Sequence, residues 1–180
     1  ICASNKNKVL SDFFRSGIYD KKREFYKTNS PSMDILISSN LERLLFEITG
    51  KDSEKVRMWM EQLNSTGSYT VDPQTLRQLQ NVFVGGFADE AGIVKTIREA
   101  YDRFDHVIDT HTAVGFDVYG RYYQRSEDDK KTIFVSTASP FKFADSVMDA
   151  ICGNGYSKGR SAETKKLFIF IFACFNNKQI

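Results

Sequence analysis

The sequence is poor in the residues that build metal centres, disulfide frameworks and nucleic-acid surfaces. It has three cysteines and two histidines among 180 residues, and Cys2, Cys152 and Cys174 show neither metal-ligand spacing nor an even-numbered disulfide framework. Free thiols suit a reducing compartment, so we expect a cytoplasmic protein. The 25 basic residues are balanced by 23 acidic ones, which argues against nucleic acid or an anionic membrane as a partner.

Long hydrophobic runs are scarce as well. The longest, Leu167 to Phe175, contains nine residues, whereas a helix that spans a bilayer needs roughly 20. This run follows a glycine-rich polar stretch and predicts either a buried strand or helix, or a non-native extension. We therefore expect residues 1–152 to form the folded part and residues 153–180 to form an atypical tail.

The beginning of the chain lacks an initiator methionine and a basic signal peptide. Ile1 to Ser4 has the composition of the end of a buried strand. A chain that opens inside a sheet is expected to be a fragment or the product of a truncated gene.

Apolar spacing and capping residues predict a series of helices. Asp72, followed by Pro73, is a typical helix start, and Ser39 with Glu42 fits a capping box. Further helices are predicted from Val9 to Phe14 with Gly17 as the stop, from Leu41 to Ile48, from about Ser53 to Gly67, after Asp89, after Thr112 and after Pro140.

Short apolar runs between these helices predict strands. They are Val82–Val84, His106–Asp109 and Thr132–Ser136, whereas Tyr19 to Asn29 is charged and predicts a loop. Strands that alternate with helices favour an α/β fold with a mostly parallel sheet and flanking helices.

Polar residues follow three of the expected strands, where α/β proteins bind ligands. They are Ser4–Asn5, Asp109–Thr112 and Ser136–Ser139. The hydroxyls of Thr112 and Thr137 can both donate and accept hydrogen bonds, but each residue could equally be a cap or a strand end. His111 lies at such a junction and is either a functional or a structural hydrogen-bonding residue.

A second candidate cluster surrounds the predicted capping box. Arg43 lies one turn into that helix and is either a clamp for phosphate or carboxylate or a solvent-facing charge. Asn40 precedes it among small polar residues. No catalytic triad or metal motif can be argued from spacing, and Gly85–Gly86 lacks the rest of a nucleotide-binding pattern.

Three motifs in register resemble those of threonine synthases. Ser30–Ile35 with Ser38–Phe46 resembles the family's SPSMDI and SSNxERLLF run. Asp109–Gly115 resembles its DPHTAVG motif, and Ser136–Phe143 resembles its STAHPAKF motif. Ile1–Leu10 resembles the strand and helix after the family's phosphate-binding loop. The resemblance covers Ile1 to about Cys152.

This resemblance implies the tryptophan-synthase-β-like architecture of fold-type II pyridoxal-phosphate enzymes, a three-layer sandwich of which this chain would be part. The family converts O-phosphohomoserine and water to threonine and phosphate, with pyridoxal phosphate as electron sink. Thr137 matches the residue that hydrogen-bonds the pyridine nitrogen. His111 and Thr112 would lie near the substrate, and Asn40 and Arg43 would bind its anionic groups.

Departures from the family pattern limit what this chain is expected to do alone. The family's Schiff-base lysine and glycine-rich phosphate loop lie upstream of Ile1, so no catalytic residue is assigned and we expect the chain by itself to be inactive. Thr110 replaces the family's proline, and Ser139 replaces its histidine. The remainder of the threonine synthase fold is then an expected partner.

Two alternatives remain open from the sequence. One is a non-catalytic, threonine-synthase-like chain that acts through binding or association, because an exposed half-sheet favours pairing with another chain. The other is a phospho-lyase that acts on a related phosphorylated amino acid.

Overall fold

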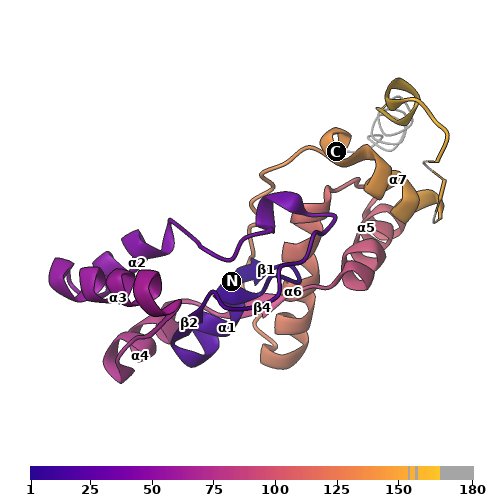
Figure 1. Cartoon of the computed structure of the whole chain (residues 1–180). Helices are drawn as coiled ribbons and strands as arrows, with labels where there is room; N and C mark the ends of the chain where they lie inside the picture. Colours follow the sequence, from indigo (N-terminus) through magenta and orange to yellow (C-terminus); the bar gives the residue numbers. More distant parts are fainter. Residues whose placement is uncertain (154, 157, 167–180) are drawn as a thin grey trace. The chain divides into compact units, whose positions relative to one another are not determined.

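The computed structural model describes residues 1–153, 155–156 and 158–166. The strand or helix expected at Leu167–Phe175 lies outside these described residues. The chain divides into two compact units, whose elements are shown in Figure 1. The first contains residues 1–27 and 32–87, and the second contains residues 28–31 and the chain from Ala88 onward.

A parallel strand pair opens the first unit. Strand β1 (Cys2–Ser4) pairs with β4 (Gly85–Phe87), with Cys2 opposite Gly85. The strand expected at the beginning of the chain is thus confirmed. Two parallel strands need a crossover connection between them, which brings the chain back to the end of the sheet where the first strand began. Between β1 and β4 this connection contains helices.

Strand β4 is formed by the glycines and not by the apolar residues before them. Val82 ends helix α4 (Pro73–Val82), so the strand predicted at Val82–Val84 was wrong. Helix α1 (Val9–Ser16) packs against β4, and a Cβ on Gly85 would lie 2.7 Å from the carbonyl oxygen of Ser11. Only a residue without a side chain permits this approach.

An antiparallel strand pair, formed by β2 (Ile18–Asp20) and β3 (Ser68–Thr70), places Tyr19 opposite Tyr69. The sequence prediction of a loop from Tyr19 onward was therefore wrong at its start. The partner of β2 is distant in sequence, and a single buried tyrosine in a charged stretch gave no strand signal.

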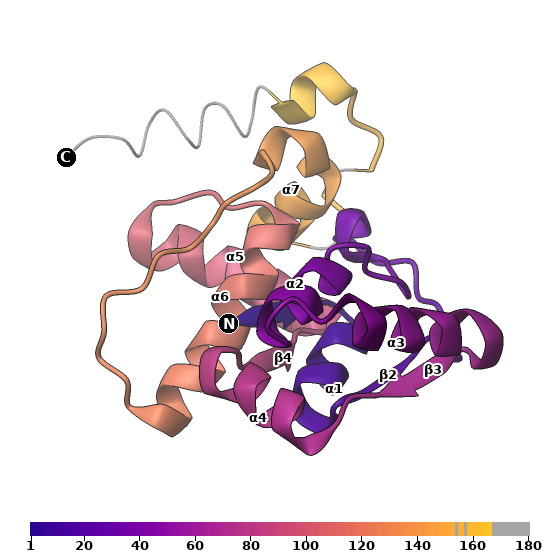
Figure 2. The ribbon, with the colours of Figure 1, turned by 90° about the vertical axis from the view of Figure 1, so that its left-hand side faces the viewer.

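Helices α2 (Leu41–Ile48) and α3 (Ser53–Thr66) belong to the same unit as this strand pair (Figure 2). Helix α3 begins at Ser53, where the sequence predicted it, and Asp52 caps it by accepting a hydrogen bond from the backbone of Lys55. The capping box expected for α2 was wrong by one residue, because Asn40 is its N-cap and makes no side-chain cap bond.

The hydrophobic core of the first unit contains residues from helices α1, α2, α3 and α4, from strands β2 and β3, and Val71 after β3. Its buried members are Val9, Phe13, Phe14, Tyr19, Leu41, Leu45, Val56, Trp59, Leu63, Tyr69, Val71 and Leu79.

The second unit is helical. Helix α5 (Glu90–Phe104) packs against α6 (Thr110–Ser126) and against α7 (Ala144–Cys152). Asp89 caps α5 as predicted, and its side chain accepts from the backbone of Gly92. The buried apolar faces are Ile93, Ile97 and Ala100 on α5, Val114 and Val118 on α6, and Val147, Met148 and Ile151 on α7.

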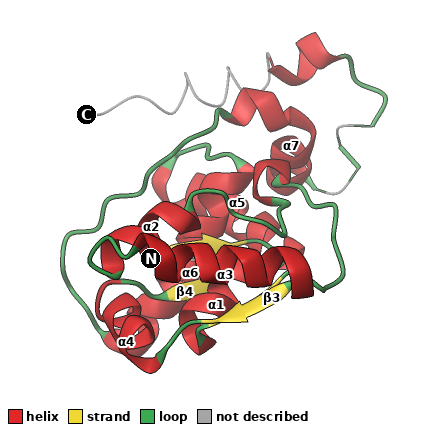
Figure 3. Ribbon diagram, turned by 60° about the vertical axis from the view of Figure 1, so that its left-hand side comes forward, coloured by secondary structure: helices red, strands yellow, loops and turns green. Residues whose placement is uncertain are grey.

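Two strands predicted for this unit are absent from the described residues. Val107 and Ile108 are buried but form no strand, and the Thr132–Ser136 segment is part of the long loop between α6 and the short 3-10 helix η2 (Pro140–Phe143) (green in Figure 3). A strand requires a neighbour to which it can hydrogen-bond, and within the described part of the chain neither segment has one.

The α/β class predicted from the sequence is nevertheless confirmed. The parallel pair of β1 and β4 packs against α1, and helices connect the two strands along the chain. Helices and a parallel strand pair in this order are the elements of an α/β layer.

Candidate functional site

Asp109 organises the start of α6. It is 1% exposed, and its extended backbone ends the segment that enters the helix. Its Oδ1 accepts hydrogen bonds from the backbone nitrogens of His111, at 2.8 Å, and Thr112, at 3.4 Å. A helix begins with backbone N–H groups that lack intrahelical acceptors, and a carboxylate there satisfies them. Asp109 therefore fixes the first turn of α6.

The same carboxylate orients the His111 ring. Nδ1 of His111 lies 3.0 Å from Oδ1 of Asp109, and the ring packs on Phe143 with centroids 4.6 Å apart. If Nδ1 carries the proton and donates it to Asp109, Nε2 is the acceptor in the neutral ring. The buried imidazole is thereby held in one orientation.

Thr112 links this turn to the loop that carries the third motif. Its hydroxyl donates to Oδ2 of Asp109 and lies 2.9 Å from the hydroxyl oxygen of Ser136. Thr137 follows Ser136 directly and has an exposed side chain. The structure thus joins the first turn of α6, with His111 and Thr112, to Ser136 within the second unit, and Thr137 is the next residue along the loop.

Asn40 and Arg43 lie in the first unit, apart from that group in the chain. Both are exposed at the start of α2. They are neighbours at three-residue spacing, which places side chains on the same side of a helix. Free N–H groups at a helix N-terminus and a guanidinium both favour anions, so the arrangement remains compatible with the predicted anion-binding role.

The sequence analysis named Asn5 as a polar strand-end residue but missed the amide–carboxylate cluster to which Asn5 belongs. The Asn5 side chain donates to Asp34 Oδ1 at 2.7 Å, and the Asn7 side chain donates to the same oxygen at 3.0 Å. Asn5 and Asn7 are almost completely buried. Asparagines directly after strand β1 were the available signal, but their pairing with Asp34 depends on a contact between distant segments. The cluster ties the start of α1 to the motif that contains Asp34.

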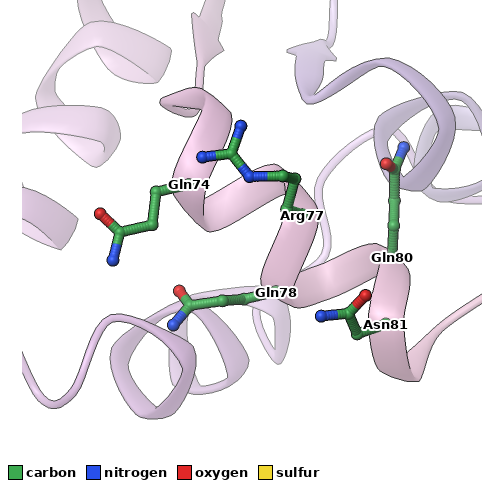
Figure 4. A pocket seen from close by; sticks show the side chains of 5 residues that line it. All are labelled: Gln74, Arg77, Gln78, Gln80 and Asn81. Atoms are coloured by element: carbon green, nitrogen blue, oxygen red, sulfur yellow. The ribbon is translucent and has the colours of Figure 1, made fainter.

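A separate polar hollow of about 370 Å³ lies along α4 (Figure 4). Glutamine, asparagine and arginine side chains line it, all from that helix, and none is a predicted site residue. Gln80 donates to the carbonyl oxygens of Phe14 and Arg15, at 3.2 and 3.0 Å. It therefore satisfies the end of α1, and the hollow adds no catalytic group.

Neither a membrane span nor a metal cluster is found in the described part of the chain. No helix there is long and apolar enough to cross a membrane. In the same residues, no group of three or more histidine, cysteine, aspartate or glutamate side chains is placed to hold a metal ion.

Comparison with protein families gives a match between residues 112–169 and a family described as "Threonine synthase, C-terminal". Among curated proteins, the chain is 37% identical over 152 residues to "Threonine synthase-like 1" of Macaca fascicularis, covering 84% of this chain and 20% of that protein. It is 33% identical over 183 residues to "Threonine synthase" of Saccharomyces cerevisiae, covering 92% of this chain and 36% of that protein.

Solved structures give the same result. A crystal structure described as PLP-bound threonine synthase from Brucella melitensis matches with a TM-score of 0.74 and 36% identity, covering 84% of this chain and 32% of that one. The yeast threonine synthase structure matches with a TM-score of 0.78 and 32% identity, covering 93% and 36%. The chain spans about a third or less of the length of these relatives, and the fold class implied by the motif resemblance is confirmed.

Proposed function

Because this chain belongs to the threonine synthase family and corresponds to the C-terminal part of its members, we propose that it contributes that part of a pyridoxal-phosphate enzyme. The complete enzyme would convert O-phosphohomoserine and water to L-threonine and phosphate. The observation that carries the proposal is the cluster in which Asp109 holds His111 and Thr112, and Thr112 holds Ser136.

Thr137, which follows the Ser136 of this cluster in sequence, would bind the pyridine end of pyridoxal phosphate. Thr137 offers an exposed hydroxyl next to a serine that is fixed by a 2.9 Å contact, and a hydroxyl can donate to a ring nitrogen. When bound, the cofactor supplies an electron sink for carbanion chemistry. A neutral hydroxyl leaves the nitrogen less protonated than a carboxylate would, so Thr137 would moderate that electron withdrawal.

The other site residues would position the substrate. Asp109 keeps the buried side chains of His111 and Thr112 in fixed orientations, which reduces the cost of ordering them when the substrate binds. Asn40 and Arg43 would bind its phosphate or carboxylate oxygens at the N-terminus of α2. By itself the chain would not convert substrate, because no lysine in it matches the family's catalytic lysine.

Activity of the complete gene product that carries this sequence tests the proposal. It should release phosphate from O-phosphohomoserine only when pyridoxal phosphate is present. Thr137→Ser should retain the cofactor absorbance band and most of the activity, whereas Thr137→Ala should shift the pH dependence of that band. Cofactor-independent activity, or a Thr137→Ala protein with an unchanged band and rate, would contradict the assignment.

One observation favours the second candidate, a chain that acts through association. Ile133 and Val135 are 89% and 79% exposed, while Phe134 between them stacks on Phe116 with centroids 3.9 Å apart. An extended segment with apolar residues on its open side is suited to pairing with another strand. The same surface would serve the first candidate if the remainder of the fold supplies that strand.

A further inference from the structure

The loop between α6 and η2 is fixed to α6 at two of its residues. The Phe134 ring stacks on Phe116, with centroids 3.9 Å apart, and meets the Tyr119 ring edge-on at 5.1 Å. Two residues further on, the hydroxyl oxygen of Ser136 lies 2.9 Å from that of Thr112. Residues at spacings of three and four lie on the same side of a helix, so Thr112, Phe116 and Tyr119 form one stripe on α6 along which the loop is held.

The two anchors agree in length and direction. From Phe116 back to Thr112 the helix rises by about 6 Å, and the two residues of chain from Phe134 to Ser136 span about 6.6 Å when extended. The loop therefore runs along α6 towards the first turn of that helix, and Thr137 is the next residue in that direction.

The residues between and beside the anchors face away from α6. Ile133 and Val135 are 89% and 79% exposed, whereas Phe134 and Ser136 contact the helix. This alternation is that of extended backbone, in which successive side chains point to opposite sides. Thr137 continues the exposed series, and its side chain is exposed.

The two adjacent hydroxyls of Ser136 and Thr137 consequently have different tasks. A threonine hydroxyl has one proton, and Thr112 donates its proton to Oδ2 of the buried Asp109. Ser136 is therefore the donor in its contact with Thr112, and its proton is committed to that anchor. The hydroxyl of Thr137 lies on the open side, where it can donate to a ligand.

We propose that Ser136 is a positioning residue for Thr137. By donating to Thr112 it fixes the backbone directly before Thr137 and so sets the place of the hydroxyl that would donate to the pyridine nitrogen. A group that is already in place loses less conformational freedom when its ligand binds. The inference rests on the proposed function, because it takes Thr137 as the residue that contacts the cofactor.

Absorbance titration of the complete gene product with pyridoxal phosphate tests the inference. Ser136→Ala should bind the cofactor about three- to tenfold more weakly than the wild type, and the pH midpoint of the cofactor band should shift in the same direction as in Thr137→Ala. Ser136→Thr retains the hydroxyl and should restore both values. Ser126→Ala removes a serine hydroxyl that donates to the carbonyl of Tyr122 at the end of α6, and this matched control should behave like the wild type.

Combining the two alanine substitutions shows whether Ser136 acts through Thr137. In a Thr137→Ala background, Ser136→Ala should cause no further shift of the band and less than about twofold further loss of affinity, because the hydroxyl that Ser136 places is already gone.

The inference and the proposed function fail in distinguishable ways. Additive losses in the double variant overturn the inference, and so does a Ser136→Ala protein that binds cofactor like the wild type while Thr137→Ala shifts the band. If Thr137→Ala itself leaves the band unchanged, the assignment of Thr137 in the proposed function is wrong, and the inference is overturned with it.

Discussion

Asp109 is the residue on which the candidate site depends most. Replacing it with asparagine keeps the shape but exchanges a charged acceptor for an amide that serves its neighbours, including Thr112, less well. We expect Asp109→Asn to lower the free energy of unfolding by about 2 kcal/mol, measured by urea denaturation of the chain.

Asp89 offers a matched control for that substitution. Its side chain caps α5 by accepting from the backbone of Gly92. Asparagine is as good a cap as aspartate, so Asp89→Asn should change stability by less than about 0.5 kcal/mol. Equal effects at the two positions would mean that the Asp109 contacts contribute no more than ordinary capping.

Asp72 makes the stability of the first unit depend on pH. Partial burial acts to raise the pKa of Asp72, but hydrogen bonds from Lys55 and Thr75 and the charge of Lys55 outweigh it and hold the pKa well below its usual range. A carboxyl with a depressed folded pKa stabilises the fold above its unfolded pKa of about 3.9, and that stabilisation is lost as pH falls below it.

Lys55→Gln tests the origin of this pH dependence. The wild type should lose thermal stability between about pH 5 and pH 2 more steeply than the variant, because the variant lacks the Lys55–Asp72 ion pair. Parallel pH profiles of the two melting temperatures would show that the ion pair does not set the pKa of Asp72.

Close packing of α1 on strand β4 is the sharpest constraint at the level of elements. Because a Cβ on Gly85 would lie 2.7 Å from the Ser11 carbonyl oxygen, Gly85→Ala should destabilise the chain by about 2–3 kcal/mol. A Cβ on Gly115, inside α6, would meet no atom within 4 Å beyond the backbone of its own helix and its chain neighbours. Gly115→Ala should instead stabilise by about 0.5–1 kcal/mol, and chemical denaturation of both variants gives the comparison.

Helices were predictable from the sequence where their signals are local. Asp72 and Asp89 cap helices as expected, and Gly17 and Gly67 end helices with positive φ angles of 73° and 82°. These signals act within one turn, so a single sequence contains them.

Strands were predicted poorly because their evidence is not local. The Thr132–Ser136 run has strand-like composition but no partner in the described residues, whereas β4 begins with two glycines and is defined by its pairing with β1. The candidate site was likewise predicted where its signals are local and missed where they are not. His111 and Thr112 could be identified beside a capping aspartate, but the contact of Thr112 with Ser136 and that of Asn5 with Asp34 join distant segments.

For the molecule as a whole, the exposed pair Ile133 and Val135 predicts association. Changing both to serine removes apolar surface that is exposed in the folded chain, so the free energy of unfolding should change by less than about 0.5 kcal/mol. The affinity of self-association, or of pairing with the rest of the fold, should fall by at least about tenfold. Sedimentation velocity measures this, and Val82→Ser, at a position that is 67% exposed, is the control that should leave association unchanged.

The aromatic cluster of the first core also has a spectroscopic consequence. Trp59 is the single tryptophan of the sequence, it is 2% exposed, and it stacks on Tyr69 at 6.1 Å. Its emission should therefore report the unfolding of the first unit, whereas far-ultraviolet circular dichroism records helices of both units. Comparing the two signals during denaturation then measures whether the two units unfold together or one after the other.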